Sequence, residues 1–491
     1  MKKLIYFTFI LFSGVATAQI KDVVLSKPIK ISAVDLYKQR EPNIIYANDS
    51  FVYAVITRDD SKAFNIKPEK HTLVKYDART LEIISEINVP FAFHYVFGDT
   101  LAYSIRYNEV QFFSKYNLRT QDSVSYIPKF DKVEESETAI RMTGDKKAIY
   151  AINYYRNSEG NIQVSYKVLG LDFKILHERD FSMPYYANKH MEERLYFNQI
   201  RIDSDYNIYF GLWVRNPKEW GYKSVHHYEV IKYTLASGKL SKYDTDIGSE
   251  LYSVCTFFAT DDQTKRLRVF GTYSINYGEC IGGFYVTEFD MVTAQKIDFR
   301  KIPFTPELVQ SVRKTGLYKS KDNELCYAGC PSFFHTISTD DNRLFYLSLF
   351  SEASERMGQL FISLDNNWNI KWTSFNYMEQ KLTQIPYIQL KANVSVLSDS
   401  SICFYFNDRT TKDRNSEFQK YAKSKILDTH IPFIAKVNKE NGGIERFPLI
   451  PLAEKGLILH ITSVENFSGK VLYAIAANKK QEQFLVKIVM G

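Results

Sequence analysis

Short stretches in which apolar and polar residues alternate with a period of two recur along the whole chain, and tight polar turns separate them. These stretches are rich in β-branched and aromatic residues, a composition that favours β-strands. Long amphipathic stretches with capping signals at both ends, which would predict helices, are absent from the sequence. The pattern therefore predicts an all-β protein.

One kind of predicted strand recurs eight times. It follows a tight polar turn, is apolar and ends on an aromatic residue, and in six copies a small residue such as Ala54, Ala151 or Gly211 comes next. Small residues at one level of a strand permit neighbouring sheets to pack closely. The eight aromatic positions are Tyr53, Tyr103, Tyr150, Phe210, Phe270, Tyr346, Phe404 and Tyr473. From the first to the last of them the interval averages 60 residues.

A second kind of strand ends in a turn of the type Lys–aromatic–Asp. LVKYD around Tyr76, FSKYN around Tyr116 and VTEFD around Phe289 are clear copies. The other five copies centre on Leu171, Tyr233, Leu364, Val437 and Ile488. A further apolar strand precedes the first kind, as at Phe93–Phe97, and another follows the second kind, as at Gln295–Ile302. Each repeat thus predicts four antiparallel strands.

Four antiparallel strands repeated at this period are typical of propeller blades. The eighth copy reaches the C-terminus after its third strand, and a spare strand, Val23–Ile31, precedes the first blade, which begins near Asn43. We therefore predict an eight-bladed β-propeller of four-stranded antiparallel blades, closed by the N-terminal strand, as one domain over residues 19–491. A seven-bladed ring with one decorating hairpin is the alternative.

The first 18 residues have the pattern of a signal peptide. Lys2 and Lys3 precede the apolar run Leu4–Phe12, and Ala16–Ala18 is a small-x-small cleavage signal. The apolar run is shorter than the roughly 20 residues that a membrane-spanning helix needs. We expect an exported mature chain without a transmembrane segment, which is periplasmic, associated with the outer membrane, or extracellular.

The charge pattern argues against nucleic acid as a partner. The chain of 491 residues has a formal charge of +7, and its 24% of charged residues are interspersed. Nucleic-acid-binding proteins instead carry a basic patch or stripe.

Two motifs resemble known propeller repeats. IDSDYNIYF, at residues 202–210, resembles the turn-and-strand signature of the NHL and TolB-like propellers. KYD–x–x–T, at residues 75–80, is similar to blades of YVTN-type and of uncharacterised secreted Bacteroidetes propellers. The resemblance implies the fold but indicates no specific family, and it supplies no catalytic residues.

In a propeller, the loops between strands two and three and between blades lie on one face, and here these loops are the long ones. They span Arg58–His71, Lys129–Thr138, Phe181–Phe197, Val214–Tyr228, Phe304–Phe334, Ser374–Gln389 and Asn407–Pro432. We call their face the long-loop face. Clustering of long loops on one face indicates a binding face. Neutral drift of loop sequences on a face without functional constraint would also produce such clustering.

The long loops are rich in aromatic and basic residues, which stack on sugars or pack on peptides. The candidate binding residues are Tyr185, Tyr186, His190, Arg194, Trp220, His226, His227, His335, Tyr377, Tyr387 and Arg414.

Catalytic and metal-binding motifs are mostly missing. The sequence has no Gly-x-Ser-x-Gly, no Gly-rich phosphate loop and no His-Glu-x-x-His. His226 and His227 are neighbours, a poor arrangement for joint metal binding. Asp203–Asn207 resembles the start of a calcium loop, but Ile208 and Val214 occupy the positions that need Gly and Glu. We interpret it as a polar turn and predict neither a metal nor a cofactor.

Four of the five cysteines offer two candidate disulfides, because an exported chain can be oxidised. Cys326 and Cys330 lie in the longest connection between blades, and Cys255 and Cys280 belong to one blade. Cys403 lies inside a predicted strand, and we predict that it is a buried thiol.

These patterns favour a non-enzymatic binding or scaffold propeller that acts in a bacterial envelope assembly, outer-membrane or secretion-associated, through its long-loop face. Its partner is expected to be another envelope protein, with a glycan or a peptide as alternatives. The rival hypothesis is a carbohydrate-active enzyme or glycan-binding protein with its site at the mouth of the central channel.

Overall fold

The computed structural model describes most of the chain after the predicted signal peptide, which lies outside the described residues. The described residues are 20–29, 43–58, 70–89, 93–97, 101–106, 112–117, 120, 122–130, 137–143, 147–159, 161–183, 199–215, 225–248, 251–275, 280–314, 325–326, 333–339, 342–350, 356–365, 367–379, 393–398, 401–410, 417, 420, 430–466, 471–478 and 482–490.

Apart from one two-stranded ribbon, the described strands form eight four-stranded antiparallel sheets, which we number 1 to 8 in chain order. Sheet 1 contains β2 (Asn43–Ala47), β3 (Phe51–Arg58), β4 (Lys70–Asp77) and β5 (Ile83–Val89). Sheet 2 contains β6 (Phe93–Phe97), β7 (Leu101–Arg106), β8 (Phe112–Asn117) and β9 (Ser123–Tyr126). Sheet 3 contains β10 (Glu137–Met142), β11 (Ala148–Arg156), β12 (Ile162–Gly170) and β13 (Ile175–Met183). Sheet 4 contains β14 (Gln199–Ile202), β15 (Ile208–Arg215), β16 (Val225–Thr234) and β17 (Lys239–Asp244).

The second half of the chain repeats this order. Sheet 5 contains β18 (Tyr252–Asp261), β19 (Arg266–Ser274), β21 (Gly283–Asp290) and β22 (Lys296–Pro303). Sheet 6 contains β24 (Phe333–Thr339), β25 (Asn342–Phe350), β26 (Arg356–Leu364) and β27 (Ile370–Glu379). Sheet 7 contains β28 (Asn393–Ser398), β29 (Ser401–Arg409), β30 (His430–Asn438) and β31 (Ile444–Pro448). Sheet 8 contains β32 (Ile458–Asn466), β33 (Val471–Ala477), β34 (Gln483–Met490) and, from the other end of the chain, β1 (Ile20–Leu25).

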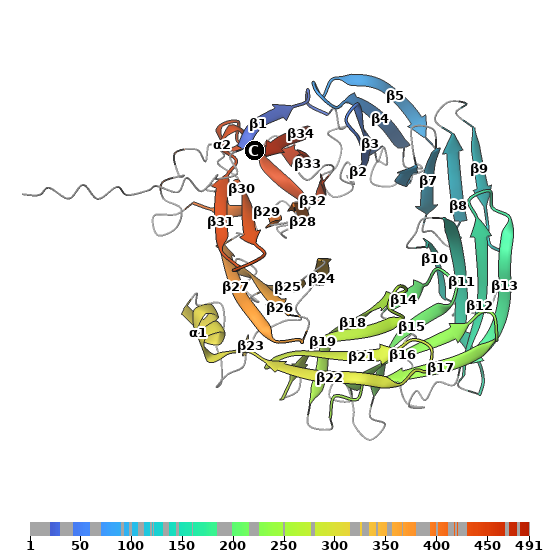
Figure 1. The fold of residues 1–491 in the computed structure, drawn as a ribbon. Coiled ribbons are helices and arrows are strands. Elements are labelled where there is room, and N and C mark those ends of the chain that lie inside the picture. The colour runs from blue at the N-terminus through green and yellow to red at the C-terminus, as the bar shows by residue number, and fades with distance from the viewer. Residues whose placement is uncertain are drawn as a thin grey trace, which may run out of the picture.

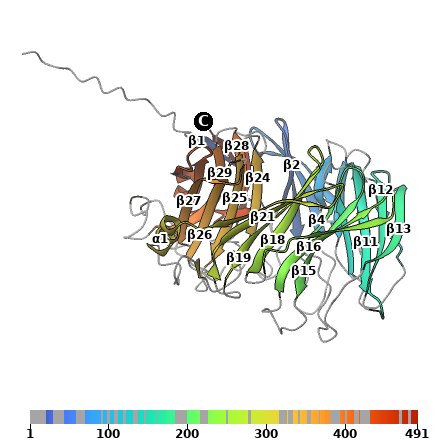
Figure 2. The same cartoon turned by 60° about the horizontal axis from the view of Figure 1, so that its bottom comes forward.

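The sheets follow one another around a common centre, with the first strand of most sheets innermost and the fourth outermost (Figure 1). When the view is turned by 60°, the strands can be followed between the two ends of this ring (Figure 2). The predictions of an all-β fold and of four-stranded antiparallel repeats are therefore confirmed.

The eight aromatic positions of the first repeat all lie in the second strand of a sheet, and the central residues of the second repeat lie in the third strand or directly after it. The small residues beside the aromatics stand where packing is tight. A Cβ on Gly211 would lie 1.8 Å from the hydroxyl of Tyr228 and 3.1 Å from a ring atom of Phe258 in the next sheet. Glycine thus permits sheets 4 and 5 to approach, as the repeat pattern indicated.

The N-terminal segment pairs with the last sheet. In the register of β1 and β34, Val23 lies opposite Ile488, and beyond β1 an isolated bridge joins Ile29 to Gln483. Sheet 8 also packs on sheet 1, because Ile44 and Val52 share an apolar cluster with residues of β33 and β34. The predicted pairing is present, although the strand ends at Leu25 rather than Ile31.

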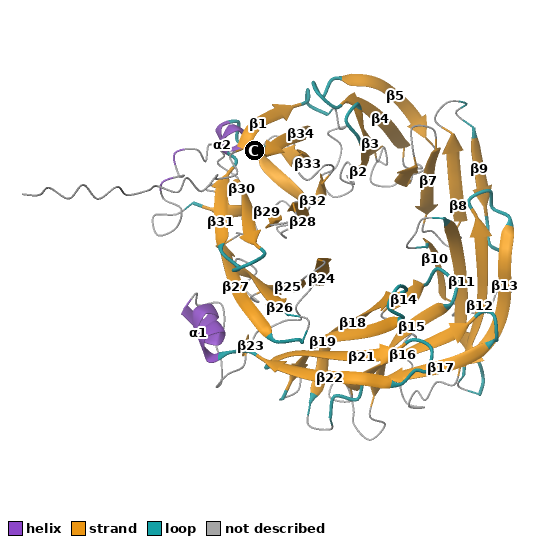
Figure 3. Ribbon diagram, viewed as in Figure 1, coloured by secondary structure: helices purple, strands orange, loops and turns teal. Residues whose placement is uncertain are grey.

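Within the described ranges, two short helices depart from the all-strand pattern, and both lie outside the ring (Figure 3). They are α1 (Pro306–Lys314) and α2 (Ile450–Glu454). The start of α1 has a local signal that the sequence interpretation did not use. Thr305 accepts a hydrogen bond from the amide of Leu308 at 3.3 Å, and Pro306 and Glu307 occupy the first turn, where both residue types are favoured.

Candidate interaction face

The long connections leave the sheets at one end, and most of their residues lie outside the described part of the chain. Seven candidate residues therefore have no described position, and their binding role stays a prediction. They are Tyr185, Tyr186, His190, Arg194, Trp220, Tyr387 and Arg414.

The other four candidates lie in strands rather than in loops. His226 and His227 belong to β16, His335 to β24 and Tyr377 to β27. Backbone pairing continues further than the polar sequence suggested, with Tyr377 opposite Gly358 and His335 opposite Tyr346. Ladder hydrogen bonds join backbone groups and do not require apolar side chains, so the predicted loop boundaries were too wide.

The connection after sheet 5 is partly an ordered structure. In α1, Leu308, Val309 and Val312 are buried in one cluster with Phe284 of sheet 5 and Leu360 of sheet 6. Tyr377 is half-buried and packs against the same cluster. The helix exposes Gln310 and the basic end formed by Arg313 and Lys314. A helix whose apolar side is buried and whose outer side is charged can present side chains to a partner while the fold holds it in place.

Asp408, at the end of β29, has a fully buried side chain and forms an ion pair with Arg446 of β31. The guanidinium of Arg446 lies 5.0 and 4.9 Å from the ring centroids of Phe406 and Phe433. The amide of Arg409 donates to the same carboxylate at 2.9 Å. This arrangement compensates a buried charge and ties the second strand of sheet 7 to its outer strand.

Three buried hydroxyl groups of sheet 5 form a closed set close to the start of β18 and β21. The oxygens of Ser253, Thr256 and Tyr285 lie 2.6–2.7 Å from one another. Each hydroxyl can donate one hydrogen bond and accept another within the set, so the three groups satisfy one another without water. We interpret them as a packing element of the sheet.

At the opposite end, short turns bearing Asp or Asn join the strands, and we call this end the short-turn rim. Asp77 accepts hydrogen bonds from the amides of Arg79 and Thr80, both at 2.8 Å. Asp290 accepts in the same way from Val292 and Thr293, at 2.9 and 2.8 Å. Comparable turns lie at Asn117, Asp172, Asp261, Asp365 and Asn438.

Asp203 forms such a turn between β14 and β15, which confirms the polar-turn interpretation. Its carboxylate accepts from the amides of Asp205 and Asn207 and, at 3.0 Å, from the hydroxyl of Tyr209. Its oxygens are therefore engaged by donors of the chain itself. Burial and the nearby Asp203 carboxylate raise the pKa of Tyr209 far above its usual value, so this hydroxyl stays a donor.

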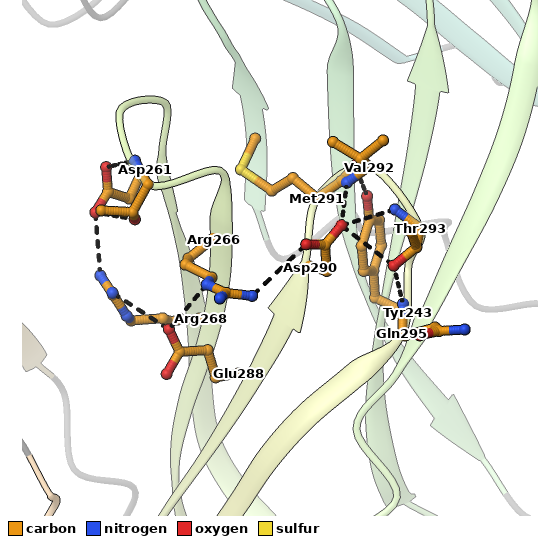
Figure 4. Close-up of polar contacts among 11 residues, drawn as sticks. Tyr243, Asp261, Arg266, Arg268, Glu288, Asp290, Met291, Val292, Thr293 and Gln295 are labelled. Carbon is orange, nitrogen blue, oxygen red and sulfur yellow. Dashed lines mark hydrogen bonds and ion pairs between the residues drawn. The ribbon is translucent and has the colours of Figure 1, made fainter.

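Opposite charges line one side of sheet 5 near the short-turn rim (Figure 4). Arg268 lies 3.5 Å from Asp261 and 3.3 Å from Glu288, and Arg266 lies 3.6 Å from Asp290. The hydroxyl of Tyr243 in sheet 4 donates to the carbonyl of Met291 at 2.9 Å. The ion pairs are partly exposed and hence individually weak, but together they link three strands.

The turn carboxylates predict acid sensitivity. Hydrogen bonds from the Thr293 and Val292 amides hold the pKa of Asp290 below its ordinary 3.8. Because the folded-state pKa is the lower one, the stabilisation is complete above the unfolded value and is lost as pH falls through the folded one. We expect Asp290→Ala to lower Tm at pH 7 by about 1 °C, and by less at pH 2. Thermal unfolding at both pH values tests this. Asp290→Asn keeps a side-chain oxygen that can accept the two amide hydrogen bonds. Its Tm should therefore stay close to that of the unchanged protein, and the acid-dependent part of the stabilisation should be lost. An equal loss for Ala at both pH values would contradict the assignment.

The sequence interpretation missed a group of exposed aliphatic residues on the outer strands of sheets 1 to 3. They are Ile83 and Ile84 in β5, Val124 in β9, and Ile175 and Leu176 in β13. The signal was available, since two apolar residues in succession, as in the pairs on β5 and β13, break the period of two.

Among the described residues, His, Cys, Asp and Glu nowhere gather in threes in an arrangement that could hold a metal ion. In the same part of the chain, no helix is both long and apolar enough to cross a membrane.

Comparisons with known proteins find only distant similarity. No protein-family model matches the chain, and no curated protein sequence does. Among solved structures, BamB from Moraxella catarrhalis is 10% identical with a TM-score of 0.38, and the match covers 92% of this chain and 99% of that one. The β-propeller domain of the Trilobed protease from Pyrococcus furiosus is 11% identical with a TM-score of 0.35, over 86% and 97% of the two chains. The polysaccharide lyase Uly1 is 12% identical with a TM-score of 0.33, over 92% and 99%. Similarities this distant carry no argument about activity or partner.

Proposed function

We propose that the protein is an eight-bladed β-propeller, closed by β1, that acts as an exported, non-enzymatic binding or scaffold protein in a bacterial envelope assembly. Its partner would be another envelope protein, bound through the long-loop face. The proposal of export rests on the sequence pattern of residues 1–18.

The observation that carries the proposal is the difference between the two ends of the ring. At the short-turn rim, strands are joined by turns that Asp and Asn side chains hold with hydrogen bonds, as at Asp77 and Asp290. At the other end, connections of very different length leave the sheets, and one of them carries α1. Regular scaffolds commonly place binding residues on irregular loops of this kind.

Affinity purification of the tagged mature protein from its source envelope, followed by mass spectrometry and sizing, tests the proposal. We expect a stoichiometric protein partner. The double variant Arg313→Glu/Lys314→Glu, on the exposed end of α1, should reduce recovery of the partner about tenfold or more.

The matched control reverses charge at the short-turn rim, where Arg79 and Lys174 are exposed. Arg79→Glu/Lys174→Glu should leave recovery unchanged. A partner lost only with the rim control, or with Ile83→Lys/Ile175→Lys on the outer strands, would place the interface elsewhere. A monomer that recovers no protein but degrades or retains glycans would replace the scaffold proposal with the carbohydrate hypothesis.

A further inference from the structure

A short ribbon outside the eight sheets brings two cysteines together. It consists of β20 (Cys280–Ile281), between β19 and β21, and β23 (Leu325–Cys326), in the connection from sheet 5 to sheet 6. The strands are antiparallel, with Cys280 opposite Cys326 and Ile281 opposite Leu325. Directly opposite residues in such a pair have Cα atoms about 4.5–5.5 Å apart, within the range of about 4.4–6.8 Å found in disulfides.

The ribbon is anchored in the fold on the side of Cys280. Ile281 is buried in the cluster that contains Val309 and Val312 of α1. The amide of Gly282 donates to the carbonyl of Tyr273 at 2.9 Å, and the carbonyl of Gly282 accepts from the amide of Phe304 at 3.0 Å. The backbone hydrogen bonds of Gly282 and the burial of Ile281 therefore fix the position of Cys280.

We propose that Cys280 and Cys326 form a disulfide that fastens the connection between sheets 5 and 6 to sheet 5. Because each cysteine makes only one such bond, this disulfide excludes the pairings Cys326–Cys330 and Cys255–Cys280 that the spacing suggested. The loop that this disulfide closes contains α1, so the bond would hold the apolar side of that helix against sheets 5 and 6.

The oxidation proceeds by thiol–disulfide exchange with a protein or low-molecular-weight disulfide. One of the two thiolates attacks the donor disulfide, forms a mixed disulfide and releases one donor thiol. The second thiolate then attacks the mixed disulfide and releases the other donor thiol. The two cysteines lose two protons and two electrons, and the donor disulfide is reduced to two thiols.

Peptide mapping of the mature protein, purified from an oxidising compartment and digested without reductant after alkylation in denaturant, tests the pairing. Denaturant is needed because burial raises the pKa of the Cys403 thiol to about 12 and protects it from alkylation in the folded protein. We expect a linked peptide pair that contains Cys280 and Cys326, and three alkylated cysteines. Reductant should lower Tm by several degrees, since the bond closes a long loop.

Cys280→Ser and Cys326→Ser should each abolish the linked pair and the effect of reductant on Tm. Cys330→Ser and Cys255→Ser are the matched controls and should retain both. Linked peptides for Cys326–Cys330 or Cys255–Cys280, or five free thiols in folded protein from an oxidising compartment, would overturn the proposal. None of these outcomes depends on whether the long-loop face binds a partner.

Discussion

Deleting residues 20–29 should lower the free energy of unfolding by about 3 kcal/mol or more, because it removes the strand that joins the two ends of the chain. Ile29 is buried in the cluster shared by sheets 1 and 8, and Val23 and Leu25 pack against a cluster formed by sheets 6, 7 and 8. A fully buried aliphatic side chain contributes about 1.5–3 kcal/mol, and the entropy of ordering the segment offsets part of the sum. Urea unfolding of the two mature proteins measures the difference.

The deletion should also leave the edge of β34 unpaired, so we expect the shortened protein to associate more readily with itself. In the complete chain, the backbone amide of Ser26 donates a hydrogen bond to the carbonyl of Leu485 at 2.9 Å, and the amide of Ile29 donates to the carbonyl of Gln483 at 2.7 Å. A synthetic peptide of residues 20–29 should restore part of the stability in trans. Lys27→Ala is the control, because Lys27 is exposed within the same segment. Equal midpoints for the full and shortened chains would contradict a closing role for β1.

Arg446→Ala should cost about 3–5 kcal/mol, and more than Asp408→Ala. The side chain of Asp408 has 0% exposure, whereas that of Arg446 is 26% exposed. Removal of the arginine takes the ion-pair partner Arg446 away from a buried carboxylate, which is strongly destabilising. Removal of the aspartate leaves a guanidinium that can still reach water and the rings of Phe406 and Phe433. Chemical unfolding of the two single variants and of the double variant gives the coupling energy between the two side chains.

The control for this pair is Arg300→Ala. Arg300 lies 3.0 Å from Asp298, but both side chains are substantially exposed, so the expected change is at most about 1 kcal/mol. If Arg446→Ala and Asp408→Ala lowered the free energy of unfolding equally, the burial of Asp408 would not control the energy of the pair.

The sequence alone determined the elements whose signals are local. The alternation of apolar and polar residues indicates which residues can form a half-buried strand, and the predicted Phe93–Phe97 coincides with β6. The aromatic repeat marked the second strand of every sheet, and the incomplete eighth copy indicated that the N-terminal strand would pair with it. Each of these inferences needs only the order of residues within one repeat, or a count of strands.

Only the tertiary structure decided the features that join distant segments. Helix α1 is stabilised by an apolar cluster from two sheets, so its periodicity alone did not distinguish it from a loop. The placement of Cys280 opposite Cys326 depends on strand register, and the ion pair between Asp408 and Arg446 depends also on which side chains lose contact with water. Register and burial are properties of the packed chain, because they arise from contacts between residues that no local pattern relates.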